Sequence, residues 1–310
     1  MNSDQLRYFE LAYTEKSFSA AARRIPVSHQ GLTKSIRALE RELGVPLFEA
    51  DEDAPTPVPT PYAHELYEYV QVLRSNTRLL YEAFDRLRGQ ERFTVRLGCS
   101  LGVLNAFGPE LIDGFVAAHP NVEVPYWESN DALCEQGLKE GRYDLALCVS
   151  PVASGCEGEA LYESPMYFWL RRDDPLAVRL AQEGRASLRV EDLAGRDIAI
   201  PGTGFKCLAH LRAAAQTHGV ELGRVLELSE IFQLYGYAVE GRVLGFANGT
   251  LIDLPVFRRD DSVVALPVEG LTWGFSIARL TTHALGDAER WLWNWCLATA
   301  HDLPNNALSK

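Results

Sequence analysis

The chain has 310 residues, of which 47% are hydrophobic and 23% are charged, and this length allows two or three domains with cores of ordinary composition. The N-terminus lacks a basic region followed by an apolar run, and no apolar stretch reaches the length of a membrane span. We therefore expect a cytoplasmic protein that does not contact a membrane. The six cysteines are scattered without a CxxC pair, so we expect most of them in the core and expect no metal or cofactor.

The net charge of −12 is by itself unfavourable for nucleic-acid binding, but the charge is unevenly distributed. Residues 1–48 contain seven Lys or Arg and five Asp or Glu, a balance of +2. The distribution of charge matters more for DNA binding than the sum, because only the docking surface must attract phosphates. The N-terminal segment is therefore the candidate for contact with DNA.

Three helices are predicted in the first 43 residues. Ser3 is expected to cap the first, which runs to about Tyr13, and Ser17 to cap a short second helix that contains three alanines. Pro26 lies in the turn that follows, because proline cannot continue a helix. Ser28 then caps a third, longer helix that stops at Gly44. The expected inner face of this helix consists of Leu32, Ile36, Leu39 and Leu43.

A short helix, a tight turn and a longer amphipathic helix are typical of a helix-turn-helix. In such a motif the polar face of the second helix meets base edges in the major groove, where Gln suits adenine, Lys suits guanine and Thr can touch thymine. Spacing alone also leaves open a solvated polar face on a helical hairpin. The predicted DNA-binding residues are Arg24, Ser28, His29, Gln30, Thr33, Lys34 and Arg37.

The order of several short motifs resembles the signature of the LysR-type transcriptional regulators. The motifs are Gln5-Leu6-Arg7-Tyr8-Phe9, Ser17-Phe18-Ser19-Ala20-Ala21-Ala22, Val27-Ser28, Leu32-Thr33-Lys34-Ser35-Ile36 with Leu39-Glu40, and Leu43-Gly44-Val45-Pro46-Leu47-Phe48. The resemblance implies an α/β protein with an all-α winged helix-turn-helix, a long linker helix and a two-lobed effector domain like that of periplasmic binding proteins. The expected bounds are 1–59, 60–90 and 91–310, with lobe I at about 91–163 and 268–310 and lobe II at about 164–267.

The wing departs from the family pattern. The family usually carries basic residues after the position of Phe48, whereas here Glu49, Asp51, Glu52 and Asp53 place four acids in five residues before a proline-rich stretch. Acidic side chains repel phosphates, and alternating prolines favour an extended strand. We therefore expect DNA binding to depend on the recognition helix and on dimerisation. Losing one or two phosphate contacts would flatten the salt dependence by roughly one or two units of slope.

The predicted linker helix begins with Thr60 as its cap and Pro61 in its first turn. Apolar residues then recur at heptad spacing, which favours a seam between two copies of the helix, although packing on its own domain is the alternative. A homodimer would place two recognition helices one turn of DNA apart, and a homotetramer stays open. The predicted dimer seam is Leu66, Val70, Leu73, Leu80, Phe84 and Leu87.

Beyond residue 92 strands alternate with helices, which indicates a parallel sheet covered by helices. Ligands of such sheets bind where the carboxyl ends of strands meet loop amides, and the family places its effector in the cleft between the lobes. Short glycine-rich turns are also common without any ligand. The predicted effector-binding residues are Ser100, Leu101, Gly102, Ser150, Gly202, Thr203, Gly204, Phe205 and Asn248. Four aromatic residues stay open between core and cleft: Tyr126, Trp127, Trp169 and Trp273.

The predicted function is therefore a DNA-binding regulator whose small-molecule effector alters DNA binding or bending. The partners are double-stranded DNA, the effector and further copies of the chain, and RNA polymerase stays open as another. No nucleophile–base pattern appears, so we do not expect an enzyme. Two alternatives remain: a redox sensor that uses Cys99 or Cys207, and a small-molecule binding protein or enzyme on the same two-lobed fold.

Overall fold

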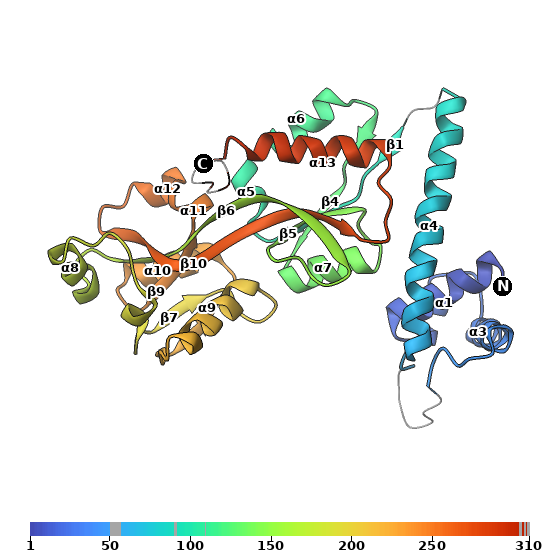
Figure 1. Ribbon diagram of the computed structural model, residues 1–310, viewed down its shortest axis with the longest axis horizontal. Coiled ribbons are helices and arrows are strands. Elements are labelled where there is room, and N and C mark those ends of the chain that lie inside the picture. The colour runs from blue at the N-terminus through green and yellow to red at the C-terminus, as the bar shows by residue number, and fades with distance from the viewer. Residues whose placement is uncertain (50–56, 90–91, 109, 304–305, 307, 309–310) are drawn as a thin grey trace. The chain divides into compact units, whose positions relative to one another are not determined.

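The computed structural model describes the chain except for residues 50–56, 90–91, 109, 304–305, 307 and 309–310 (Figure 1). The chain separates into two compact units, residues 1–91 with 282–284 and residues 92–281 with 285–310. We call them the N-terminal unit and the effector unit. None of the described helices combines the length and the apolar character that a membrane crossing requires.

The N-terminal unit is built from four helices whose starts are fixed by capping side chains. Ser17 and Ser28 accept backbone N–H groups from the first turns of their helices, as predicted. The cap of the first helix is Asn2 rather than Ser3, because Asn2 and Gln5 form a reciprocal capping box. The helices are α1 (Ser3–Glu15), α2 (Phe18–Arg23), α3 (His29–Leu43) and α4 (Pro61–Leu87).

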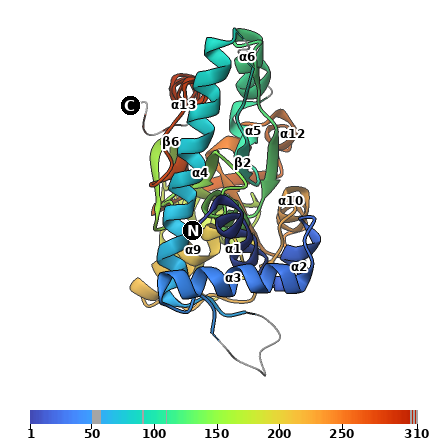
Figure 2. The same ribbon diagram turned by 90° about the vertical axis from the view of Figure 1, so that its right-hand side faces the viewer.

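The core of this unit forms where α1, α2 and α3 meet the start of α4, and Figure 2 shows the three shorter helices gathered at the N-terminal end of α4. Leu32, Ile36 and Leu39 are buried there, as the helical spacing of α3 predicts. Leu43 is instead 38% exposed, since it lies in the last turn of α3, just before the chain reverses at Gly44 with φ +73°. The predicted inner face of α3 is therefore wrong at its last position.

The base of the wing is anchored by Glu40, a buried carboxylate of α3. Glu40 accepts the N–H groups of Leu47 and Phe48 at 2.8 and 3.2 Å, and Phe48 pairs with Pro59 in an antiparallel bridge. These bonds hold the two arms of the wing together next to α3. The predicted acids Asp51, Glu52 and Asp53 lie outside the described residues.

The effector unit is organised around an eight-stranded sheet in the order β4-β2-β5-β10-β6-β9-β7-β8, beside a two-stranded sheet of β1 and β3. Strand β2 pairs in parallel with β4 and β5, which confirms the predicted parallel sheet. The strands are β1 (Phe93–Thr94), β2 (Leu97–Ser100), β3 (Val122–Glu123), β4 (Tyr126–Ser129), β5 (Leu145–Val149), β6 (Cys156–Arg171), β7 (Ile198–Ile200), β8 (Val225–Glu227), β9 (Leu244–Asn248) and β10 (Val263–Leu280).

Helices follow most of these strands and flank the sheet (Figure 1). Helix α7 has the bounds that the sequence predicts. The helices are α5 (Leu104–Phe107), α6 (Glu110–Ala118), α7 (Asp131–Lys139), α8 (Pro175–Gln182), the 3-10 turn η1 (Val190–Leu193), α9 (Lys206–Thr217), α10 (Ile231–Val239), α11 (Gly249–Ile252), α12 (Pro255–Arg258) and α13 (Asp287–Ala300).

Two long antiparallel strands, β6 and β10, join the two halves of the sheet and run side by side through the unit (Figure 1). One end of β10 pairs with β5, whereas the opposite part of β6 pairs with β9. The pairing shifts between Pro267 and Thr272, midway along β10. We call the half with β2, β4 and β5 lobe I and the half with β7, β8 and β9 lobe II.

Burial settles the residues that the sequence left open. Trp169 and Trp273 are core residues, whereas Tyr126 and Trp127 on the edge strand β4 are about half exposed. Five cysteines are buried and Cys156 is partly exposed.

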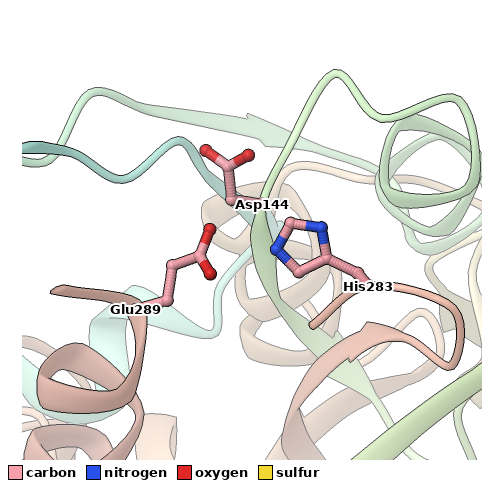
Figure 3. A group of neighbouring side chains, drawn as sticks. All are labelled: Asp144, His283 and Glu289. Carbon is pink, nitrogen blue, oxygen red and sulfur yellow. The ribbon is translucent and has the colours of Figure 1, made fainter. Parts of the chain in front are cut away.

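Two buried carboxylates of the effector unit are drawn in Figure 3, where the third residue, His283, comes from the segment after β10. Asp144 accepts bonds from the Arg96 backbone N–H, Nε and Nη2, and Glu289 accepts the Gly286 N–H that begins α13. Each carboxylate is therefore committed to holding its own part of the fold.

Candidate nucleic-acid interface and effector site

The polar face of α3 lies on the surface of the N-terminal unit. His29, Gln30 and Lys34 are exposed, and Thr33 is half-buried because its hydroxyl donates back to the His29 carbonyl at 2.9 Å. The exposed Ser28 uses its hydroxyl oxygen to accept the Gly31 N–H. The predicted contact residues of α3 therefore form one continuous exposed row from its N-terminus.

Two of the predicted contact cations are already paired with acids. Arg37 bonds to Glu40 at 3.0 Å, and Arg24, at the end of α2, lies 3.0 Å from Glu15. Both guanidinium groups stay exposed, so each can still reach a phosphate from its ion pair. Pairing lowers the net positive charge that this face presents to a duplex.

A hollow of about 500 Å³ lies beside the C-terminal half of α3. Its lining includes Arg37 together with Arg41, an exposed cation that the sequence analysis did not single out. The spacing of four residues puts both arginines on one side of the helix, and this signal was available from the sequence alone. Arg41 therefore joins Arg37 as a candidate contact for the DNA backbone.

Helix α4 carries a row of exposed apolar side chains. Leu73, Leu80, Phe84 and Leu87 are exposed and Leu66 is half-buried, as expected for a seam that a single copy cannot cover. Val70 departs from the prediction, since it is only 4% exposed and packs in the core of the N-terminal unit. The heptad count placed Val70 on the seam because α4 is apolar on two neighbouring faces.

The predicted effector loops all follow strands of the sheet. Ser100 ends β2 and Ser150 follows β5 in lobe I, whereas Gly202 follows β7 and Asn248 ends β9 in lobe II. Gly102 has φ +83° and Leu101 is exposed, while Gly204 and Phe205 continue the loop into α9. The two lobes thus each contribute two of the predicted loops.

Several polar groups of these loops are already bonded within the protein. The Thr203 N–H and hydroxyl both donate to Glu227 Oε2, at 2.8 and 3.1 Å, and Gly202 leaves the space in which Glu227 lies. Asn248 Oδ1 accepts from the N–H and hydroxyl of Thr250. The expectation that Thr203 offers its hydroxyl to a ligand is therefore wrong for this conformation. Hydrogen bonds from the Thr203 N–H and hydroxyl hold the pKa of Glu227 below its usual range.

Three charged residues that the sequence analysis missed connect the lobes. Asp131 of α7 accepts the backbone N–H of Lys206, the first residue of α9, at 2.8 Å. The Lys206 ammonium donates to the Glu135 carboxylate and to the carbonyls of Val149 and Pro151. Asp131 and Lys206 are 75 positions apart in the chain, so no local pattern signals the pairing.

The Asp131 carboxyl is only 2% exposed, and burial raises its pKa. The Lys206 N–H and the neighbouring Ser100 hydroxyl act in the opposite direction, although Ser100 makes no hydrogen bond of normal geometry. Asp131 Oδ1 and Ser100 Oγ are both buried without a hydrogen-bond partner among the residues that the structure describes. Such atoms are uncommon in folded proteins and point to a missing partner.

The two cysteines of the redox alternative are buried thiols. Burial raises the pKa of Cys207 to about 12 and that of Cys99 well above its usual range. Only the thiolate is nucleophilic, so neither thiol is prepared to react with an oxidant at neutral pH. This observation weighs against redox sensing by these residues.

Comparison with known proteins agrees with the fold. Residues 3–64 match the model of the bacterial regulatory helix-turn-helix proteins of the LysR family, and residues 88–301 match that of the LysR substrate-binding domain. The full-length structure of an OxyR variant from Pseudomonas aeruginosa superposes with a TM-score of 0.67 at 19% identity, covering 96% of this chain and 98% of that one.

Similar curated proteins are regulators. The HTH-type transcriptional regulator BenM of Acinetobacter baylyi is 26% identical over 269 residues, which are 83% of this chain and 84% of BenM. The HTH-type transcriptional regulator CbbR of Rhodospirillum rubrum is 26% identical over 271 residues, 86% of this chain and 85% of CbbR. With both domains matched in order, the chain belongs to the LysR family of transcriptional regulators and carries that family's effector-binding domain.

Proposed function

We propose that this regulator binds operator DNA as a homodimer or homotetramer and changes its DNA binding or bending when a small molecule binds between the lobes of the effector unit. The observation that carries the proposal is the exposed polar row of α3 on a capped helix-turn-helix. Because the target is DNA, the protein acts in the cytoplasm of a bacterial cell. Regulation by binding needs no catalytic step, so we propose no enzymatic activity.

The row of α3 divides into two kinds of contact. Gln30, Thr33 and Lys34 are the candidates for base edges, since they lie in the first two turns of the helix. Ser28, at the N-terminus of α3, together with Arg24 and Arg37, is the candidate set for phosphates, which position the helix without reading sequence.

Dimerisation follows from the exposed side of α4. Leu73, Leu80, Phe84 and Leu87 would be buried by a second copy of the helix, which removes apolar surface from water. Two linked recognition helices also raise each other's effective concentration at a palindromic site. The proposed dimer therefore compensates for a wing rich in acids.

A gel-shift titration tests the proposal with DNA from upstream of the chain's own gene, at low salt and with an excess of unrelated competitor DNA. We expect a retarded complex that survives the competitor, because base contacts add to the phosphate attraction. Absence of any shift, combined with turnover of a small molecule by the same preparation, would replace the regulator by an enzyme on the same fold.

A further inference from the structure

We propose that the effector carries an ammonium group and that this group binds the Asp131 carboxylate beside Ser100. The inference rests on the proposed function, because it names the chemistry of the ligand that the inter-lobe site takes. It depends on which hydrogen-bonding groups at the contact between α7 and the loop before α9 are engaged and which are not.

The backbone donors that would attract an anion are engaged. Helix α9 has 12 residues, and the N–H of its first residue, Lys206, donates to Asp131 Oδ2. The Thr203 N–H in the preceding loop donates to Glu227. Two carboxylates of the protein therefore occupy the positions at which a carboxylate or phosphate ligand would bind a helix N-terminus.

The cation at this contact is also engaged. The Lys206 ammonium has three protons to donate, and its three acceptors are the Glu135 carboxylate and two backbone carbonyls, of which Val149 lies at 2.7 Å. Its side chain is 20% exposed. An anionic ligand could bind Lys206 only by breaking these bonds and displacing Glu135.

The groups left without partners are oxygen atoms. Asp131 Oδ1 and Ser100 Oγ make no hydrogen bond in the described part of the chain, and both residues are at least nine-tenths buried. An ionised carboxylate oxygen can only accept, so it needs a donor, and a charged donor makes the stronger bond. A primary ammonium supplies three N–H donors and a positive charge, which satisfy both oxygens at once.

The charges around the site favour the same ligand. Asp131, Glu135 and Glu227 carry negative charge, against Lys206 and Arg212, of which Arg212 reaches Glu227 at 3.5 Å. The acids outnumber the bases at this contact, so a second carboxylate would add repulsion. An ammonium instead completes the neutralisation of a buried acid.

Thermal unfolding of the full-length protein tests the proposal with two probes of equal length and opposite charge, 1,4-diaminobutane and succinate. Both are titrated at constant ionic strength, with sodium chloride as the blank. We expect the diamine to raise the Tm of the wild type in a saturable way and succinate to leave it unchanged. This contrast needs no variant, so it does not depend on the folding of a mutant.

Asp131→Asn should weaken the diamine effect at least tenfold, because it removes the charge and keeps the shape of the side chain. Asp113→Asn, at an exposed position of α6, is the matched control and should respond like the wild type. A Tm that rises with succinate, fails to rise with the diamine, or rises equally in Asp131→Asn would overturn the proposal. Gel shifts on the same preparations keep the regulator proposal separate, because DNA binding does not require the diamine.

Discussion

Single side chains of this regulator show how burial decides what a polar group does. Lys34 and Asp131 are both charged, but Lys34 is exposed on a helix surface while Asp131 is nearly inaccessible and has one backbone donor. An exposed charge is available to a partner at little cost, whereas a buried charge must be satisfied by its surroundings. The expected consequences of substitution differ accordingly.

Replacement of Lys34 by alanine should weaken binding to the cognate operator by ~1–3 kcal/mol if the ammonium reads a guanine. Non-specific binding should change much less, because most phosphate contacts remain. Fluorescence anisotropy with cognate and scrambled duplexes at one salt concentration gives both affinities. Arg242→Ala, an exposed cation of the effector unit, is the charge-matched control. Unchanged affinity and unchanged site preference in Lys34→Ala would remove this residue from the contacts.

A second residue-scale prediction concerns pH. Burial acts to raise the pKa of Asp174, but its two bonds to Arg196 and the Leu176 N–H outweigh burial and hold the pKa below the usual range. A lowered folded-state pKa stabilises the fold above the ordinary range of an aspartate, and this contribution is lost as the pH falls through the lowered value. Asp174→Asn keeps the cap of α8 but loses the charge.

We therefore expect Asp174→Asn to be less stable than the wild type at neutral pH, by on the order of 1 kcal/mol after allowance for solvent screening. The difference should shrink as the solution is acidified, because the wild-type carboxyl then takes up a proton. Urea unfolding at a series of pH values measures it, with Asp261→Asn at an exposed position as the control. A difference that stays constant or grows in acid would contradict the assignment.

At the scale of elements, α4 and the pair β6–β10 carry the architecture. Helix α4 has 27 residues and serves the domain core with one face while leaving an adjacent apolar face exposed. Strands β6 and β10 belong to both lobes, so a change in the angle between the lobes must bend these two strands. The shift in their pairing between Pro267 and Thr272 marks the point at which the ladder is already interrupted.

The exposed face of α4 predicts the effect of charge on assembly. A double change of Leu73 and Leu80 to glutamate would place four acids in a dimer seam, and desolvating them should shift the protein to monomers. Sedimentation velocity measures the shift, and we expect DNA affinity to fall at least tenfold because avidity is lost. Glu68→Lys on another face of α4 is the control. A variant that stays dimeric would place the interface elsewhere.

At the scale of the whole molecule, the chain is strongly acidic and yet belongs to a family that binds a polyanion. The mild positive balance of residues 1–48 is offset by the acids of the wing directly after it. Long-range attraction to DNA should therefore be weak, and affinity should come from short-range contacts of α3 and from the linkage of two copies.

This reasoning predicts a gain of affinity when the wing is neutralised. Changing Asp51, Glu52 and Asp53 to serine should tighten non-specific DNA binding and steepen the dependence of log K on log salt by roughly one or two units of slope. Anisotropy titrations between low and physiological salt measure both. If the variant and the wild type have the same slope, or the wild type is already the steeper, the acidic wing does not face the DNA backbone.

The sequence by itself determined the helix-turn-helix, its caps at Ser17 and Ser28, the parallel order of β2 and β5 and the family. Those features depend on local signals, namely helical and strand periodicity, capping residues and turn residues, which a short window of residues contains. For the same reason the polar row of α3 could be read before any coordinates.

Only the tertiary structure decided which of two apolar faces of α4 enters the core, and so moved Val70 from the seam to the interior. It also assigned Thr203 to Glu227 and joined Asp131 and Glu135 to Lys206, across separations of 24, 75 and 71 residues. Such pairings depend on where the sheet brings loops together, and a hydrogen bond between distant residues leaves no periodic trace in the chain.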